Sequence, residues 1–555
     1  MVKVTLHSLL TVFLFLTFQI TYSQTANSSQ IDYESAIAIL NKGAYTEALE
    51  KFNKLINSGF NDNEIYKYRG IAKFRLNDFK GAAEDLDKVK ENSDELVYGL
   101  IGICKYQFRE WEASKYFLIK ATSLGFKDGI AHLYLGYLYF DEHQYKNAVI
   151  QLNEAEKAGE KESELYKSRG IAAYFSGDSD LAIQDLTKAL KFEKSSLEVY
   201  EALGLAYADK TEFKKSLPYL QKADSLDSKN SKVYFNLGKA QQEKKNYSQA
   251  IDAYSKAIEL NYTDPLVYIN RGNSKVASGL IKESIVDFDF AIKLNPENTL
   301  AYRGRVAANL LLKDWARIIT DLAIVNALGS FETPDWGVLS EAKYALKNYQ
   351  GALDEVNTAL AKGSAHYTIG GEKHSFYFQK GRCLAAMKKF EPAIQAFNQA
   401  QDEGESSVIF YLEWARAYVE LGQLEKAIGD LENAQLLYPG NSNLFYNSAV
   451  IKEEVGDFGA AVLDYSKAIK LNPEDAVAYY GRANSKARKG DLAAGIADLD
   501  KAIDLDRSNA TYYKVRANFY YQMKNKDKAC FDWRKAVEFG DEKARFSIDK
   551  YCNKK

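Results

Sequence analysis

The chain has 555 residues, of which 46% are hydrophobic and 27% charged, so it can bury a core and does not belong to the globally disordered class. Its 73 basic and 75 acidic residues leave a formal net charge of −2, which offers no positive surface for nucleic acid. Only 34 Gly and 7 Pro exclude collagen-like and Pro-rich classes. Four Cys and five His, widely scattered, predict neither a metal site nor a cofactor.

The first 23 residues have the pattern of a secretory signal peptide. Lys3 is their single charge, the run Leu9–Phe18 is apolar, and small residues stand at Thr21 and Ser23. The run is shorter than the ~20 residues that span a bilayer, and no Cys follows it as a lipid anchor. We therefore expect cleavage after Ser23, no transmembrane segment in the cleaved chain, and a periplasmic, extracellular or envelope-associated protein.

The rest of the chain repeats with a period of 34 residues. A column of small residues begins at Ala36 and Gly70 and continues to Ala517, and twelve of its fourteen intervals are 34 residues long. Small residues recur twelve positions after that column, and Ala recurs seven positions later again. A fixed period of this length is typical of a solenoid, which explains why a chain of this length shows no boundary between globular domains.

Each repeat is predicted to hold two helices. Apolar residues follow helical spacing on both sides of a polar break, and the small columns let the two helices approach closely. An Asn or Asp in the break is placed to cap the second helix, at Asp78, Asn246, Asp314, Asp457 and Asp491. The sequence therefore predicts an all-α solenoid of about fifteen helix-turn-helix repeats.

The repeated residues carry a family resemblance. Tyr234, Leu237-Gly238, Ala250, Tyr254 and Ala257, with a closing Pro in other repeats, resemble the tetratricopeptide repeat over residues 29–543. The resemblance implies a right-handed superhelix whose first helices line a concave groove for proteins or peptides. It also implies a capping helix within Ala536–Cys552. The sequence Tyr22-Ser23-Gln24 resembles the end of signal peptides from Bacteroidota.

Irregular features divide the predicted array. In repeat nine all three small columns fail together, at Val306, Ile318 and Val325, and a seven-residue insertion follows around His366–His374. Branched side chains at facing positions would hold the two helices further apart, so this region is a possible hinge, with local repacking as the alternative. We expect a signal peptide at 1–23, a first block of repeats one to eight at 24–298, irregular repeats nine and ten at 299–373, a second block of repeats eleven to fifteen at 374–543, and a capping helix and tail at 544–555.

Two rows of side chains on the first helices are expected to face the groove. The row is apolar in the early repeats and turns polar from repeat seven, so we expect two binding characters. The alternative is a closed superhelix in which the apolar row is core and binds nothing. The apolar candidates are Ile71, Phe74, Ile103, Tyr106, Tyr137, Phe140, Ile171 and Tyr174, with Leu205 in the same row. The polar candidates are Lys239, Asn270, Asn273, Glu341, Arg382, Arg416, Asn447, Asn484 and Asn518.

No catalytic motif occurs in the sequence, so we expect no enzyme. His366 and His374 lack a third metal ligand, so a plain loop or short hairpin is the favoured interpretation, with a contact to a partner as the alternative. Acidic groups such as Asp498-Leu499-Asp500 lack the spacing of a calcium loop and are interpreted as solvated helix faces.

The four cysteines fall into two pairs of different kinds. Cys104 and Cys383 occupy equivalent positions in distant repeats and are expected to be buried free thiols. Cys530, on the last second helix, and Cys552, on the implied cap, are expected to form a disulfide, since export places them in an oxidising compartment.

The sequence therefore favours a non-catalytic scaffold that binds proteins or peptides in the periplasm or cell envelope. A periplasmic chaperone or carrier for extended or apolar segments is the alternative. The Lys and Asn clamp that some tetratricopeptide proteins use for chaperone tails is disfavoured, because Lys514 and Asn518 lie in the last repeat with no partners beyond it.

Overall fold

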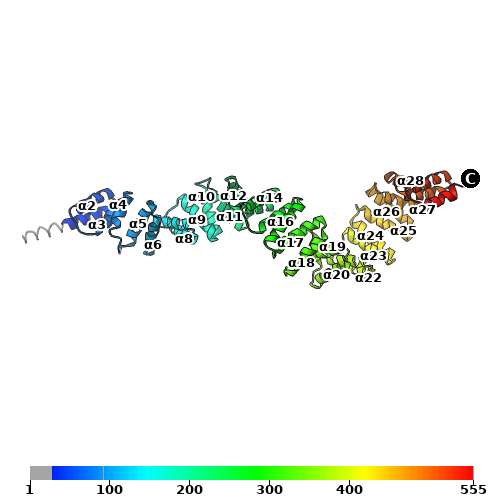
Figure 1. The fold of residues 1–555 in the computed structure, drawn as a ribbon, viewed down its shortest axis with the longest axis horizontal. Helices are drawn as coiled ribbons and strands as arrows, with labels where there is room; N and C mark the ends of the chain where they lie inside the picture. Colours follow the sequence, from blue (N-terminus) through cyan, green and yellow to red (C-terminus); the bar gives the residue numbers. More distant parts are fainter. Residues whose placement is uncertain (1–27, 92, 370, 554–555) are drawn as a thin grey trace, which may run out of the picture. The chain divides into compact units, whose positions relative to one another are not determined.

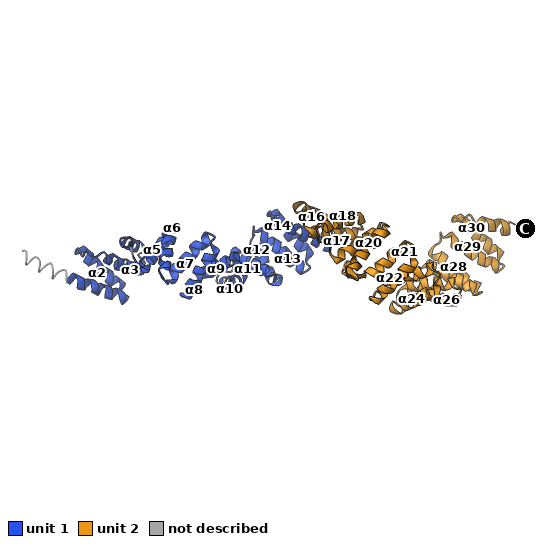
Figure 2. Cartoon of the chain, turned by 90° about the horizontal axis from the view of Figure 1, so that it is seen from below, with its two compact units in different colours: residues 1–283 blue, residues 284–555 orange. Residues whose placement is uncertain are grey.

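A computed structural model describes residues 28–91, 93–369 and 371–553 of the chain. The predicted signal peptide lies outside these residues. The described chain is an all-α helical-repeat solenoid with one short β-hairpin (Figure 1). It divides into two compact units, Met1–Glu283 and Ser284–Lys555, and the division falls inside helix α16 (Ile281–Leu294) (Figure 2). The predicted boundaries at 298 and 373 stay predictions.

Unit 1 consists of successive helix pairs, each made of the two helices expected for one repeat. It begins with a helix over residues 28–41. The helices that follow are α2 (Tyr45–Asn57), α3 (Glu64–Arg75), α4 (Phe79–Leu86), α5 (Glu95–Gln107), α6 (Trp111–Ser123), α7 (Gly129–Asp141), α8 (Tyr145–Lys157), α9 (Ser163–Ser176), α10 (Ser179–Ala189), α11 (Leu197–Asp209), α12 (Phe213–Ser225), α13 (Ser231–Glu243), α14 (Tyr247–Glu259) and α15 (Leu266–Ala277).

Unit 2 continues the same pattern and adds a hairpin and a C-terminal cap. Its helices up to the hairpin are α17 (Thr299–Leu312), α18 (Trp315–Ala327), α19 (Thr333–Ala345) and α20 (Tyr349–Ala361). The elements after them are β1 (His366–Ile369), β2 (Glu372–Ser375), α21 (Phe376–Ala386), α22 (Phe390–Asp402), α23 (Val408–Glu420), α24 (Leu424–Leu437), α25 (Ser442–Glu454), α26 (Phe458–Leu471), α27 (Ala476–Arg488), α28 (Leu492–Leu505), α29 (Ala510–Gln522), α30 (Lys526–Glu538), α31 (Ala544–Ser547) and a π-helical turn, η1 (Ile548–Cys552).

The first small column allows the two helices of a repeat to touch. A Cβ atom added at Gly136 would lie 2.6 Å from Leu152 Cγ, and one at Gly238 would lie 2.5 Å from Tyr254 Cε1. Such distances are well inside van der Waals contact, so at these two positions glycine is what lets Leu152 and Tyr254 pack against the facing helix. The second column supports the same contact, since Ser216 Oγ donates a hydrogen bond to the carbonyl oxygen of Gly204 at 2.7 Å.

Four of the five predicted helix caps are confirmed. The side chains of Asp78, Asp314, Asp457 and Asp491 each accept a hydrogen bond from a backbone N–H in the first turn of the second helix. The prediction for Asn246 is wrong. Its side-chain amide instead donates to Gln241 Oε1 at 3.1 Å, because that glutamine lies within reach at the end of the preceding helix.

A buried arginine–aspartate pair recurs in both units and joins the two helices of a repeat. The Arg precedes the small column by one residue, and its guanidinium makes two hydrogen bonds to an Asp sixteen residues later. In repeat five Arg169 Nε donates to Asp185 Oδ2 at 2.6 Å, with 2% and 0% of the two side chains exposed. The other such pairs are Arg69–Asp85, Arg305–Asp321, Arg482–Asp498 and Arg516–Asp532.

The same arginine also contacts the preceding repeat. Arg169 Nη1 donates to Asn153 Oδ1 on α8 at 2.9 Å, and Arg482 Nη1 donates to Ser466 Oγ on α26 at 3.1 Å. Burial alone would raise the pKa of Asp85, yet the hydrogen bonds from Arg69 and Lys73 hold that pKa below its ordinary value. The interpretation of Asp498 as part of a solvated face is therefore wrong, since this carboxylate is buried and paired with Arg482 and Lys486.

Repeat twelve lacks this arginine and leaves its aspartate without an Arg partner. Trp414 stands at the arginine position, and Asp430 stands at the aspartate position. In the described part of the chain, neither Asp430 Oδ2 nor Trp414 Nε1 has a hydrogen-bond partner. Burial raises the pKa of Asp430 to about 6, and the charge of Lys426 offsets only part of this.

The charge on Asp430 is therefore expected to weaken the fold as the pH rises from about 4 to about 6. The folded-state pKa lies above the ~3.9 of an unfolded chain, so the folded state binds more protons in this window and protonation stabilises it. Asp430→Asn should remove this slope and stabilise the chain at pH 7 by about 1–2 kcal/mol. Thermal unfolding between pH 4 and pH 7.5 measures the difference from the wild type. Glu425→Gln, an exposed change on the same helix, is the control. An unchanged pH slope in Asp430→Asn would contradict this account.

In unit 2, the branched residues of repeat nine are buried and the insertion after repeat ten forms a hairpin. Val306 and Ile318 lie in one buried cluster with Leu322, as expected of side chains that face each other across the helix pair, and Val325 is also buried. The insertion is an antiparallel hairpin in which His366 pairs with Ser375 and Ile369 with Glu372. The hairpin interpretation of the insertion is therefore confirmed. Whether repeat nine acts as a hinge stays a prediction.

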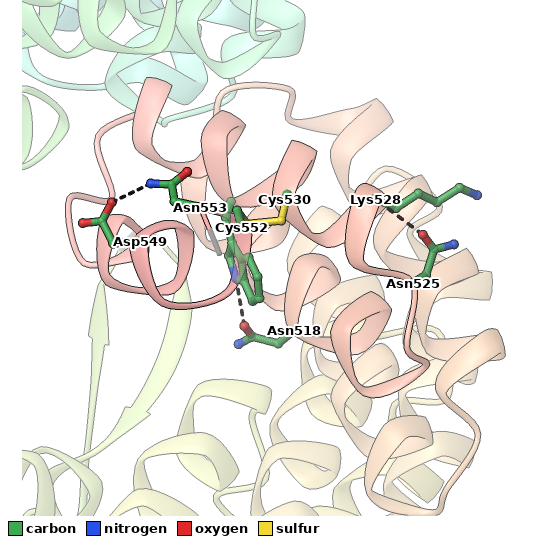
Figure 3. The surroundings of a disulfide bond; sticks show 8 residues. Asn518, Asn525, Lys528, Cys530, Asp549, Cys552 and Asn553 are labelled. Carbon is green, nitrogen blue, oxygen red and sulfur yellow. Dashed lines mark hydrogen bonds between the residues drawn. A yellow bond between two sulfur atoms is a disulfide. The ribbon is translucent and has the colours of Figure 1, made fainter. Parts of the chain in front are cut away.

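The C-terminal segment folds back on the last repeat. Cys530 on α30 and Cys552 at the end of η1 form a disulfide with a Cα–Cα distance of 5.7 Å, and Tyr551 packs against Trp533 and Tyr521 (Figure 3). Cys104 and Cys383 are buried free thiols, as predicted. Burial raises the pKa of each to about 12, which keeps them protonated and unreactive.

Candidate functional site

The predicted apolar row lies on the first helices, and its members differ in exposure. Ile103, Ile171 and Tyr174 are buried, with 3%, 7% and 9% of their surfaces exposed. The other members of this row are half-buried: Ile71, Phe74, Tyr106, Tyr137 and Phe140. Much of the row therefore packs between neighbouring first helices. Tyr106, for example, stacks on Tyr134 of α7 with ring centroids 3.9 Å apart.

Four members of the row meet in a cavity of about 620 Å³. The cavity is lined from four successive first helices, α7, α9, α11 and α13, together with the turn into α8, and we call it the repeat 4–7 pocket. Its size is within the range of ligand sites. The row residues in its lining are Phe140, Ile171, Tyr174 and Leu205, and the other lining residues are Asp141, His143, Tyr145, Phe175, Glu198, Glu201, Ala202, Asp209, Asn230 and Lys232.

Aromatic rings form one wall of this pocket. Tyr145 stacks on Phe175 with ring centroids 4.8 Å apart, and Phe140 meets Tyr145 edge-on at 6.1 Å. Phe175 is 58% exposed, which is unusual for so large an apolar side chain. An exposed ring beside a cavity offers a contact surface that the chain itself does not cover.

The remaining polar groups of the pocket are mostly acidic. Asp141, Glu198, Glu201 and Asp209 contribute carboxylates, and Lys232 contributes the single ammonium group of the lining. Lys232 Nζ donates to Tyr174 Oη at 2.7 Å and lies 3.8 Å from Asp209 Oδ1. Glu201 accepts hydrogen bonds from Ser228 and Asn230. The pocket therefore joins an aromatic wall to an excess of negative charge.

The polar row in unit 2 is partly occupied by the chain itself. Arg382 Nη1 donates to Glu341 Oε1 at 2.9 Å, and Tyr367 on β1 donates to the same oxygen at 3.1 Å. Tyr367 is buried, and its ring lies against Gly337 of α19, where an added Cβ would come within 2.0 Å. Glu341 and Arg382, predicted to contact a partner, thus contact each other and the hairpin.

Other members of the polar row lie apart. Arg416 and Asn447 line a cavity of about 310 Å³ together with Val450. Asn518 accepts a hydrogen bond from Trp533 Nε1 at 3.0 Å and so faces its own repeat. Lys239 lies over the rings of Phe213 and Phe235. Asn273 is exposed, and Asn270 and Asn484 are half-buried.

The acidic residues of the repeat 4–7 pocket were missed by the sequence reasoning. Asp141 and Asp209 are each the last residue of a first helix, one position past the row member at Phe140 or Ala208. Comparing the residue at that position in every repeat would have found both.

Among the described residues, no group of three or more His, Cys, Asp or Glu is arranged to hold a metal ion. In the same ranges, no helix has both the length and the apolar composition to cross a membrane.

Comparison with known proteins gives the following matches. Family models described as tetratricopeptide repeat match residues 197–230, 231–261, 374–402, 412–476 and 446–510. No curated protein matches the chain.

Three of the similar solved structures are compared with this chain by sequence identity, by the share of each chain that is covered and by TM-score. The Cut9–Hcn1 tetramer of APC/C shows 14% identity over 81% of this chain and 95% of that chain, with a TM-score of 0.33. YrrB, described as a TPR protein with an unusual peptide-binding site, shows 23% identity over 32% of this chain and 93% of that chain, with a TM-score of 0.28. MamA from Desulfovibrio magneticus RS-1 shows 19% identity over 29% and 92%, with a TM-score of 0.28. Tetratricopeptide-repeat models thus match parts of both units, and the helix pairs observed at the matched residues agree with that repeat.

Proposed function

We propose that the chain is a non-catalytic scaffold that binds partner proteins or peptides along its first helices in the bacterial periplasm or cell envelope. The observation that carries the proposal is the repeat 4–7 pocket, in which four successive first helices present apolar and charged side chains around one cavity. The signal-peptide pattern supports export. The Cys530–Cys552 disulfide is consistent with an oxidising compartment.

A chaperone or carrier for extended or apolar segments is the second candidate. The exposed ring of Phe175 beside the buried side chains of Ile171 and Tyr174 favours it, because an apolar wall with a solvent-facing edge accepts many apolar sequences. The two candidates differ in the number of partners. A scaffold retains a few folded partners, whereas a chaperone retains many unfolded ones.

Affinity capture from the native envelope tests the proposal when wild type and variants serve as bait. Phe175→Ser is expected to lose most of the captured partners with little change in melting temperature, because the ring is 58% exposed and contributes little to the core. The control is Phe192→Ser, which removes another exposed ring, 65% exposed, outside the pocket lining. Equal capture by the two variants would contradict binding in this pocket.

A test that replaces several residues of the apolar row at once would be harder to interpret. Replacing Phe74, Tyr106 and Phe140 together, which the sequence suggests, would remove packing as well as contact surface. Phe74 meets Phe79 edge-on at 5.5 Å, and Tyr106 stacks on Tyr134. A loss of stability from that triple change would therefore not distinguish core from groove.

A further inference from the structure

We propose that the repeat 4–7 pocket binds an extended peptide segment in which a Lys or Arg side chain lies next to an apolar side chain. The inference rests on the proposed function and names the chemical class of its partner. Three features of the pocket carry it: an excess of carboxylates, the rings of Tyr145 and Phe175, over which no Lys or Arg of the described residues lies, and an apolar floor.

The charge of the pocket favours a cationic ligand. Its lining has four carboxylates and one ammonium group, and that group, on Lys232, is already engaged with Tyr174 and Asp209. Glu198 is paired with Lys167, which lies outside the lining, at 3.7 Å. The carboxylate of Asp141 makes no hydrogen bond or ion pair with any residue that the structure describes. Burial raises the pKa of Asp141, and the nearby His143 offsets this only in part. Asp141 is exposed at the cavity, so the cation of a ligand can reach this carboxylate without displacing an ion-pair partner.

The aromatic wall favours the same ligand. Elsewhere in unit 1, Lys side chains of the chain cover aromatic rings: Lys188 lies 4.5 Å from the ring centroid of Tyr166, and Lys120 lies 4.0 Å from that of Tyr98. Within the described residues, no Lys or Arg lies over the rings of Tyr145 or Phe175. A ring face attracts an ammonium or guanidinium group, most strongly where water is excluded. These two rings, with Asp141 at the same cavity, offer that contact to a partner.

The floor of the pocket supplies the apolar half of the site. Ile171, Ala202 and Leu205 line the cavity from α9 and α11 and are buried. An extended peptide places successive side chains on opposite sides, so one side chain can enter this floor while a residue near it reaches the rings. The aliphatic stem of Lys or Arg also packs on apolar surface while its charged end stays near the carboxylates.

Fluorescence anisotropy with three labelled peptides tests the proposal on the full chain. The first peptide is Gly-Leu-Lys-Phe-Lys-Leu-Gly, the second has Glu in place of both Lys, and the third has Ser in place of Leu and Phe. We expect the first to bind about tenfold more tightly than either of the others. Its affinity should fall as salt is raised, because the attraction is partly electrostatic.

Matched variants locate the binding. Asp141→Asn is expected to weaken the first peptide about fivefold and Phe175→Ser about tenfold. The control is Glu243→Gln, because Glu243 is the exposed last residue of first helix α13, as Asp141 is of α7, and it does not line the pocket. Glu243→Gln should leave the affinity within about twofold of the wild type.

Several outcomes would overturn the proposal. Equal or tighter binding of the Glu peptide would do so, as would an Asp141→Asn variant with wild-type affinity for the Lys peptide. If the Lys peptide fails to bind while capture of native partners still depends on Phe175, the basic-ligand inference falls and the proposed function stands. If neither peptide binding nor capture depends on Phe175, both fall.

Discussion

Arg169→Met is expected to destabilise repeat five by about 3–5 kcal/mol, because it leaves the buried Asp185 without its cation. Asp185 is fully buried, and Lys188, 3.6 Å away and one third exposed, is a weaker partner than the guanidinium. Each repeat is stabilised by its neighbours, so the loss should be local rather than global. Hydrogen exchange of amides in α9 and α10, followed by mass spectrometry, measures it as a loss of protection confined to these helices and their neighbours.

Two further variants isolate the charge effect. The double change Arg169→Met with Asp185→Leu should recover much of the lost stability, since replacing a buried pair by apolar groups is often neutral. Arg317→Met breaks an exposed pair, in which Arg317 Nε lies 3.5 Å from Asp314 Oδ2, and should cost less than about 0.5 kcal/mol. If the single and double variants lose equal protection, packing rather than the unpaired charge explains the effect.

Replacing Cys530 and Cys552 with Ser is expected to weaken the docking of the C-terminal cap by about 3 kcal/mol in the chain-entropy model, given the sequence separation of 22. The cap would then detach more often and expose Trp533, which is 2% exposed in the folded chain. Limited proteolysis within residues 540–553 measures this, with faster cleavage in the variant.

Reduction of the wild type should reproduce the variant, and reduction of the variant should change nothing, because Cys104 and Cys383 form no disulfide. Recovery of Cys530 and Cys552 as free thiols in non-reducing peptide maps would refute the bond itself. Equal cleavage rates in variant and wild type would show that packing of Tyr551 on Trp533 holds the cap without it.

The repeated architecture could be predicted because its physical cause is local and recurs. Gly136 and Gly238 mark close contacts between helices that are adjacent in sequence, so a single column of small residues reports them. The Arg–Asp pairs were missed although they follow an equally regular spacing of sixteen residues. The sequence analysis took charged residues to be solvated, whereas Asp498 is paired with Arg482 of the other helix in its own repeat.

The candidate site could be predicted only in part from the sequence. Helical spacing placed Phe140, Ile171 and Tyr174 on the face that lines the repeat 4–7 pocket. It did not show that Ile171 and Tyr174 are buried, nor that Phe175, one residue beyond the row, is the exposed ring. These details depend on how far each helix turns relative to the next, which the 34-residue period does not specify.

The hairpin of unit 2 has a consequence for any long ligand. Tyr367 places an aromatic side chain against α19 and donates a hydrogen bond to Glu341, which stands in the predicted groove row. The side chain of Tyr367 thus occupies this position of the predicted groove row. A partner chain that follows the first helices of unit 2 must end before Glu341 or displace Tyr367. Displacement would expose the Tyr367 side chain, of which only 3% is exposed in the folded chain. We therefore expect any binding along the first helices of unit 2 to be divided into shorter contacts on either side of repeat ten.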